Sequence, residues 1–169
     1  PDDPDFRHLY ALILNAQGKR SEAWEQLQKA LQIDPTHSKT RILMIETLQR
    51  DNKLAQALRV ARAWSRAEPD SSEAHFEEAK LLSREKNYKE AMEHYRKVFE
   101  LDPDFVAARS SYVQFLAGQG RIQEAIQSLG EDLNKDPEIR EGHSMLGLLL
   151  DVAGMKSEAV QVFSAGLER

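Results

Sequence analysis

Residues 87–103 read NYKEAMEHYRKVFELDP, a segment rich in helix-forming residues that ends in a proline. Its alanine, Ala91, and its proline, Pro103, both recur along the chain with a period of 34 residues. The full set is Ala23, Ala57, Ala91, Ala125 and Ala159, with Pro1, Pro35, Pro69, Pro103 and Pro137. Two residue types that keep one period without an insertion predict a tandem repeat array.

The period divides the chain into five units, at residues 4–37, 38–71, 72–105, 106–139 and 140–169. In each unit, apolar residues at spacings of three and four predict two helices of about 13 residues. Between the two helices, Gly and Asn recur at positions that suit a left-handed backbone, which ends the first helix and lets the second fold back. These turn positions hold Gly18, Asn52, Gly120 and Gly154, with Lys86-Asn87 in the third unit.

The fifth unit carries His143-x2-Leu146-Gly147 and Ala159-x3-Phe163, and the third carries Ala91-x3-Tyr95. In these features the chain resembles the tetratricopeptide repeat family along its whole length. The resemblance implies an all-α fold: a right-handed superhelical solenoid of antiparallel helix pairs, forming a single array over residues 1–169. We expect this array to be a fragment of a longer protein, because Pro1 already occupies the position that closes a repeat.

Composition excludes several classes of function. The net charge of −5 argues against binding nucleic acid, which needs clustered Lys and Arg. The absence of cysteine excludes disulfides and thiolate metal sites. No apolar run is long enough for a transmembrane helix, so we expect no direct membrane insertion. A soluble protein of the cytoplasm or the periplasm, without a cofactor, fits this composition.

Catalytic motifs are missing, so the chain is not expected to be an enzyme. No pair of histidines has the i, i+4 spacing of a helical metal site, which favours isolated surface histidines. The acidic residues Glu73, Glu77 and Glu78 are interpreted as a solvated helix face. The histidines are His8, His37, His75, His94 and His143.

Two units depart from the repeat pattern. In the second, a small Ala61 and a large Trp64 exchange the usual order of sizes, and we interpret Trp64 as a core residue rather than a ligand-stacking one. In the fourth, Gly130 lies inside a predicted helix and Asp132 replaces a buried apolar residue. Both substitutions are costly, so residues 122–135 are predicted to be a local weak point or a hinge.

The family resemblance implies that the first helix of each repeat lines a concave groove for partner binding. Ile42 and Phe76 are expected to face water there and to act as an apolar hot spot. A basic edge beside them predicts a ligand with an apolar anchor next to an acidic residue. Gln49 occupies a groove position as well. The candidate site residues are His8, Leu12, Lys39, Ile42, Glu46, Arg50, Glu73, Phe76, Lys80 and Arg84.

These features predict a non-catalytic scaffold or adaptor that binds a peptide or helix of another protein in the groove. The alternative is a structural spacer that self-associates through uncapped repeat ends within a larger assembly, of the kind found in bacterial envelope biogenesis or secretion. A third hypothesis is the recognition arm of an enzyme whose catalytic domain lies outside these residues.

Overall fold

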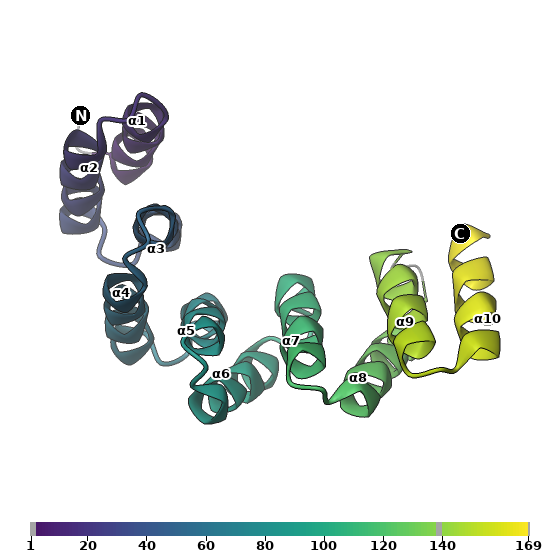
Figure 1. Cartoon of the computed structure of the whole chain (residues 1–169). Helices are drawn as coiled ribbons and strands as arrows, with labels where there is room; N and C mark the ends of the chain where they lie inside the picture. The colour runs from purple at the N-terminus through teal and green to yellow at the C-terminus, as the bar shows by residue number, and fades with distance from the viewer. Residues whose placement is uncertain (1–2, 138–139, 169) are drawn as a thin grey trace. The chain divides into compact units, whose positions relative to one another are not determined.

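The computed structural model describes residues 3–137 and 140–168, and over these ranges the regular elements are all α-helices (Figure 1). The all-α prediction is therefore confirmed. The first helices of the five pairs begin 34 residues apart, and so do the second helices. The helices are α1 (Pro4–Ala16), α2 (Arg20–Ile33), α3 (Ser38–Arg50), α4 (Leu54–Ala67), α5 (Ser72–Arg84), α6 (Tyr88–Leu101), α7 (Val106–Gly118), α8 (Ile122–Lys135), α9 (Arg140–Val152) and α10 (Lys156–Leu167).

Each helix pair is joined by a turn that contains one residue with positive φ, as predicted. In the first pair, Gly18 has φ +76° and the backbone N–H of Lys19 donates to the carbonyl of Leu14 at 2.9 Å. This bond satisfies a carbonyl at the end of α1 that would otherwise lack a helical partner. The other four residues of this kind are Asn52, Lys86, Gly120 and Gly154.

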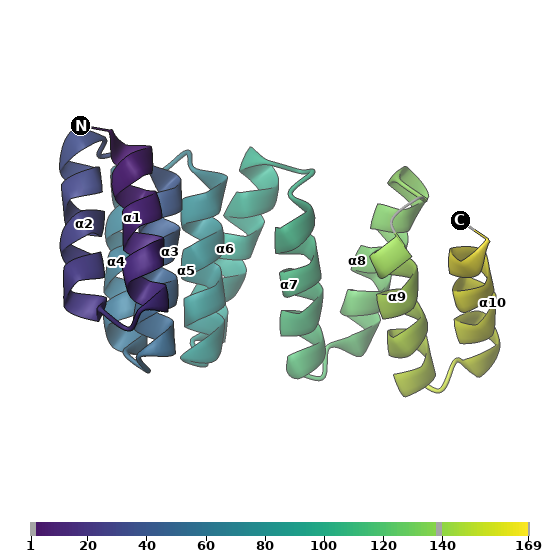
Figure 2. The same ribbon diagram turned by 90° about the horizontal axis from the view of Figure 1, so that it is seen from above.

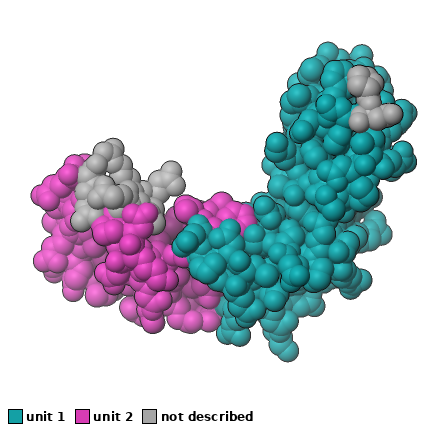
Figure 3. All heavy atoms as spheres, turned by 180° about the vertical axis from the view of Figure 1, so that it is seen from behind, with its two compact units in different colours: residues 1–104 teal, residues 105–169 magenta. Residues whose placement is uncertain are grey.

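The chain divides into two compact units, Pro1–Asp104 and Phe105–Arg169, which are described separately below (Figure 3). In the first unit, α1, α3 and α5 lie side by side on one face, and α2, α4 and α6 lie on the other (Figures 1 and 2). The first helices of successive repeats therefore form one continuous surface within this unit. The prediction that all five repeats form a single array remains a prediction.

Small residues allow the two helices of each repeat to pack closely. The periodic alanines are buried, and Ala23, Ala57 and Ala91 are completely inaccessible in the first unit. Trp64 is only 1% exposed and packs in a core cluster with Ala57, Ala61 and neighbouring aliphatic residues. The interpretation of Trp64 as core is confirmed, and the exchange of small and large residues keeps this core filled.

In the second unit, α8 is continuous through Gly130, and the Asp132 carboxylate forms an ion pair with Arg109 of α7. The predicted cost of an unpaired carboxylate therefore does not arise, whereas the weak point at residues 122–135 remains a prediction. In the last helix pair, Gly147 faces the ring of Phe163 so closely that an added Cβ would lie 2.6 Å from it. Glycine is required at this position because the two helices approach so closely there.

Within the described ranges, every helix is too short or too polar to cross a lipid bilayer.

Candidate functional site

The first unit has an open hollow on the surface formed by α1, α3 and α5. Its volume is about 940 Å³ and includes space open to solvent. Residues from three successive repeats contribute to it, because equivalent positions on the first helices lie beside one another. The lining residues are Leu12, Leu43, Glu46, Gln49, Arg50 and Arg84.

Four of the ten candidate site residues meet at this hollow: Leu12, Glu46, Arg50 and Arg84. All four side chains are exposed. The Arg84 guanidinium donates to the Gln49 side chain at 2.7 Å, which links α5 to α3 and holds the guanidinium at the rim. Two arginines and one glutamate around an exposed leucine give the hollow an apolar patch with a net positive edge.

Leu43 was not predicted as a site residue. It is buried in the core cluster of the first two repeats and also contributes to the hollow. Its helical position is that of a core residue, so the sequence pattern gave no sign of this second role.

The expectation that Phe76 faces water is wrong. Its side chain is only 8% exposed, and the Lys80 ammonium lies 4.7 Å from the centre of the ring, within range of a cation–π contact. Lys80 also pairs with the buried Glu77 carboxylate at 2.6 Å. Lys80 therefore balances a buried charge on its own helix, and the basic edge consists of Arg50 and Arg84.

The other predicted residues lie outside the lining of the hollow. Ile42 is half-buried and packs against the core of the second repeat, so it too is not an open hot spot. Lys39 is exposed near Asp5, and Glu73 accepts hydrogen bonds from serines at the start of α5. His8 is half-buried, and its ring meets the ring of His37 edge-on at 5.8 Å between centroids.

The interpretation of Glu77 and Glu78 as a solvated helix face is also wrong, because both are buried. One carboxylate oxygen of Glu78 accepts from the Ser65 hydroxyl at 2.5 Å, and the other lies 3.3 Å from Arg62 Nε. Both partners come from α4. A buried carboxylate is tolerated here because the preceding repeat supplies its hydrogen bonds and its countercharge.

Two histidines join this polar cluster, although they are 19 residues apart in sequence. The Nδ1 atoms of His75 and His94 are 2.9 Å apart, and His75 Nε2 lies 2.9 Å from the carbonyl oxygen of Pro69. A neutral His75 therefore donates to Pro69 and accepts at Nδ1 from His94. His94 Nε2 then points toward Glu78 at 3.5 Å, so the expectation of isolated surface histidines is wrong for this pair.

This cluster predicts that the protein loses stability in mild acid. Burial, opposed by the Glu78 charge and assisted by His75, lowers the pKa of His94 below its ordinary value, and burial lowers the pKa of His8. The unfolded chain therefore binds more protons just below about pH 6.5, and the free energy of unfolding falls as the pH drops through this range. Urea titrations at pH 7.5 and 5.5 check this.

The matched variant for this titration is His94→Gln, which keeps a polar side chain but cannot titrate. We expect its stability to depend less on pH over the same range than that of the parent chain, with the His8 contribution left. An unchanged pH dependence in the variant would show that His94 does not contribute.

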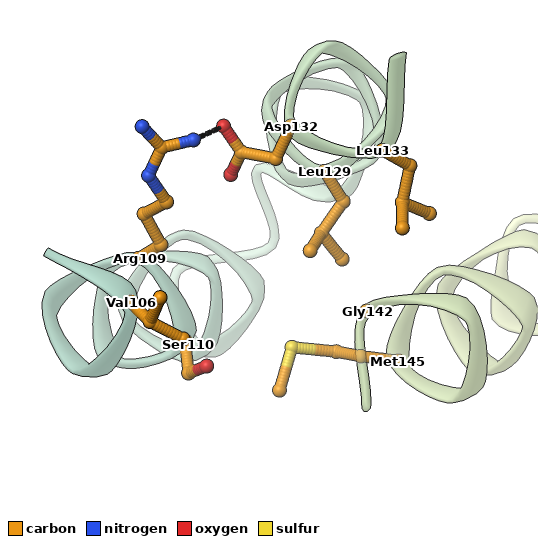
Figure 4. Close-up of a pocket in the computed structure, with 8 residues that line it drawn as sticks. All are labelled: Val106, Arg109, Ser110, Leu129, Asp132, Leu133, Gly142 and Met145. Carbon is orange, nitrogen blue, oxygen red and sulfur yellow. Dashed lines mark hydrogen bonds and ion pairs between the residues drawn. The ribbon is translucent and has the colours of Figure 1, made fainter. Parts of the chain in front are cut away.

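The second unit has a separate cavity of about 390 Å³ between α7, α8 and α9 (Figure 4). Leu129 and Met145 point into it, and the Arg109–Asp132 ion pair lies at its side. Burial raises the pKa of Asp132 above its ordinary value, even though the Arg109 charge acts in the opposite direction. The desolvation cost of this carboxylate therefore exceeds the attraction from its partner.

The described residues show no further chemistry. Within residues 3–137 and 140–168, no three His, Asp or Glu side chains gather in a way that could hold a metal ion. The polar clusters lie between helices and satisfy one another, whereas the hollow leaves exposed charge beside exposed apolar surface. The hollow is therefore the candidate site.

Several solved structures share the fold at low sequence identity. MamA from Desulfovibrio magneticus RS-1 matches with a TM-score of 0.74 and 18% identity, over 99% of this chain and 95% of that one. Pseudomonas aeruginosa PilF matches with a TM-score of 0.76 and 16% identity, over 98% and 75%. YrrB, described as a TPR protein with an unusual peptide-binding site, matches with a TM-score of 0.66 and 16% identity, over 99% and 86%.

Curated proteins gave no significant match to this chain. A profile of the tetratricopeptide repeat matches residues 14–81 and 82–149, which together make up more than half of the sequence. The helix pairs, their turns and this match agree with one another, and the fold is that of protein-interaction scaffolds. The chain belongs to the tetratricopeptide repeat family.

Proposed function

We propose that this chain is a non-catalytic adaptor that binds a peptide or helical segment of another protein in the hollow on α1, α3 and α5. The observation that carries the proposal is that Leu12, Glu46, Arg50 and Arg84, from three successive repeats, line one open hollow. A surface that combines exposed apolar and charged groups suits peptide capture better than it suits chemistry on a small substrate. YrrB, with its described peptide-binding site, supports this use of the fold by analogy alone.

The chemistry of the lining favours one kind of ligand. An apolar side chain of the ligand would lie on Leu12 and Leu43, and an acidic side chain close by would pair with Arg50 and Arg84. Glu46 would repel a second acidic residue at its own edge and so restrict the spacing of the motif. The proposed ligand is therefore a segment in which an apolar anchor is followed or preceded by one carboxylate.

The test is selection from a random peptide library, followed by titration of the enriched peptides. We expect the enriched sequences to pair a large apolar residue with Asp or Glu. Reversing both charges with Arg50→Glu and Arg84→Glu should weaken binding by at least about tenfold, since two favourable contacts become repulsive. Arg66→Glu, on an exposed position of α4, is the matched control and should bind like the parent chain.

Photo-crosslinking from position 12 in a lysate of the source organism then identifies the natural partner. Phe76 is unsuitable for the reactive group because it is buried. Enrichment of peptides without acidic residues, or binding that survives both charge reversals, would contradict the proposed ligand.

A further inference from the structure

α1 presents a stripe of large apolar side chains to solvent: Phe6, Leu9, Tyr10 and Ile13. They follow one another at helical spacings of three, one and three, so they share one face of the helix. Each of them is between 42% and 57% exposed. Monomeric proteins rarely leave such a contiguous apolar patch open, which indicates an interaction surface.

The repeats themselves show what covers this face. The equivalent residues of α3, 34 positions further along, are Thr40, Leu43, Met44 and Thr47, and all are at most 7% exposed. In α5 the equivalents are Ala74, Glu77, Glu78 and Leu81, which are also buried. These helices pack against the second helix of the preceding repeat, α2 for α3 and α4 for α5. A second helix of the repeat type is therefore the natural occupant of the open α1 face.

α10 offers the matching surface. Val160, Phe163 and Leu167 are 64%, 37% and 88% exposed, and they occupy the positions that Trp24, Leu27 and Leu31 occupy in α2. In the first unit, those three α2 residues share one core cluster with Leu43 and Met44 of α3. The apolar residues that bury a first helix inside the array thus have exposed counterparts on α10.

We propose that a second copy of this chain covers the α1 face with its α10 helix, so that copies associate head to tail. The register follows from an internal contact: the Ser65 hydroxyl of α4 reaches the Glu78 carboxylate of α5 at 2.5 Å. The equivalent positions are residue 167 on α10 and residue 10 on α1. Leu167 of one copy therefore packs on Tyr10 of the next.

This contact joins two different surfaces, so each copy keeps one free α1 face or one free α10 face after pairing. Association of this kind continues beyond a dimer unless a ring closes. An isologous contact, in which the same face meets itself, would stop at two copies. The distinction gives the proposal a sharp test.

Sedimentation velocity of the 169-residue chain over a range of concentrations measures the association. We expect the average mass to rise beyond two copies. Leu9→Glu with Ile13→Glu on α1 should prevent this rise, and so should Val160→Glu with Leu167→Glu on α10, because each places carboxylates in an apolar contact. Either pair of changes should weaken association by at least about tenfold. All four side chains are exposed, and circular dichroism checks that both variants remain folded.

Mixing the two variants is the decisive experiment. The α1 variant retains an intact α10 face and the α10 variant retains an intact α1 face, so the mixture should form a one-to-one pair that grows no further. Val152→Glu, exposed on α9 outside both faces, is the control and should associate like the parent.

A parent chain that stays monomeric at every concentration would overturn the proposal. An α10 variant that still dimerises alone would also overturn it, since that result means α1 pairs with α1. Arg50→Glu with Arg84→Glu should leave the association unchanged, which separates this surface from the peptide-binding hollow.

Discussion

Trp64→Ala is expected to lower the free energy of unfolding by about 3–5 kcal/mol, the usual cost of removing a buried tryptophan. The side chain is almost completely buried, and its loss would leave a cavity against Ala57 and Ala61, whose short side chains cannot fill it. Urea unfolding followed by circular dichroism measures the change.

Trp64 also supports a polar contact that alanine would abolish. Its indole N–H donates to Glu68 at 3.1 Å, and the Arg41 guanidinium, which pairs with Glu68, lies 5.6 Å from the ring centre. Trp64→Phe keeps most of the volume but loses the indole N–H, so we expect a smaller loss of stability than with alanine. A ligand-stacking role predicts the reverse pattern, in which alanine removes binding and leaves stability unchanged.

The sequence period predicted the helices well because it reports local requirements that act within each repeat. Gly18 and its equivalents end the first helix by adopting positive φ, and Ala91 and its equivalents permit close helix packing. Neither requirement depends on the rest of the chain. Helix type, pairing and turns were therefore accessible from residue spacing alone.

The side chains of the candidate site were harder to predict, because their exposure depends on neighbouring repeats. Phe76 occupies a groove position, yet it is covered and lies beside Lys80. Glu78 appeared to be one charge among several on a helix, whereas Ser65 and Arg62 from the preceding repeat surround it. Position within one repeat does not report these contacts.

Long-range polar pairing was not visible in the sequence for a similar reason. His75 and His94 lie on different helices, and so do Arg109 and Asp132. A search for local motifs tests spacings within one helix and misses pairs that form only after two helices dock. Asp132 could therefore be identified as a misfit in the apolar pattern, but its partner could not be named.

That partner leads to a second large effect: Asp132→Ala is expected to lower the free energy of unfolding by roughly 3 kcal/mol. Both side chains of the pair are largely buried, with 15% of Arg109 and 12% of Asp132 exposed. Alanine removes the carboxylate that balances the guanidinium while the guanidinium remains desolvated between α7 and α8. The loss should appear as a lower urea midpoint for the second unit.

The double variant Arg109→Met with Asp132→Leu separates the cost of stranding a charge from the net value of the pair. Since burial raises the pKa of Asp132 despite the Arg109 charge, the pair itself contributes little, and its apolar replacement beside Leu129 and Met145 should restore stability to within about 1 kcal/mol of the parent. The exposed pair of Arg121 and Glu124 is the control, and Glu124→Ala should change the urea midpoint little. If the double variant is as unstable as Asp132→Ala, the ion pair stabilises the unit in its own right, and the desolvation argument for this site is wrong.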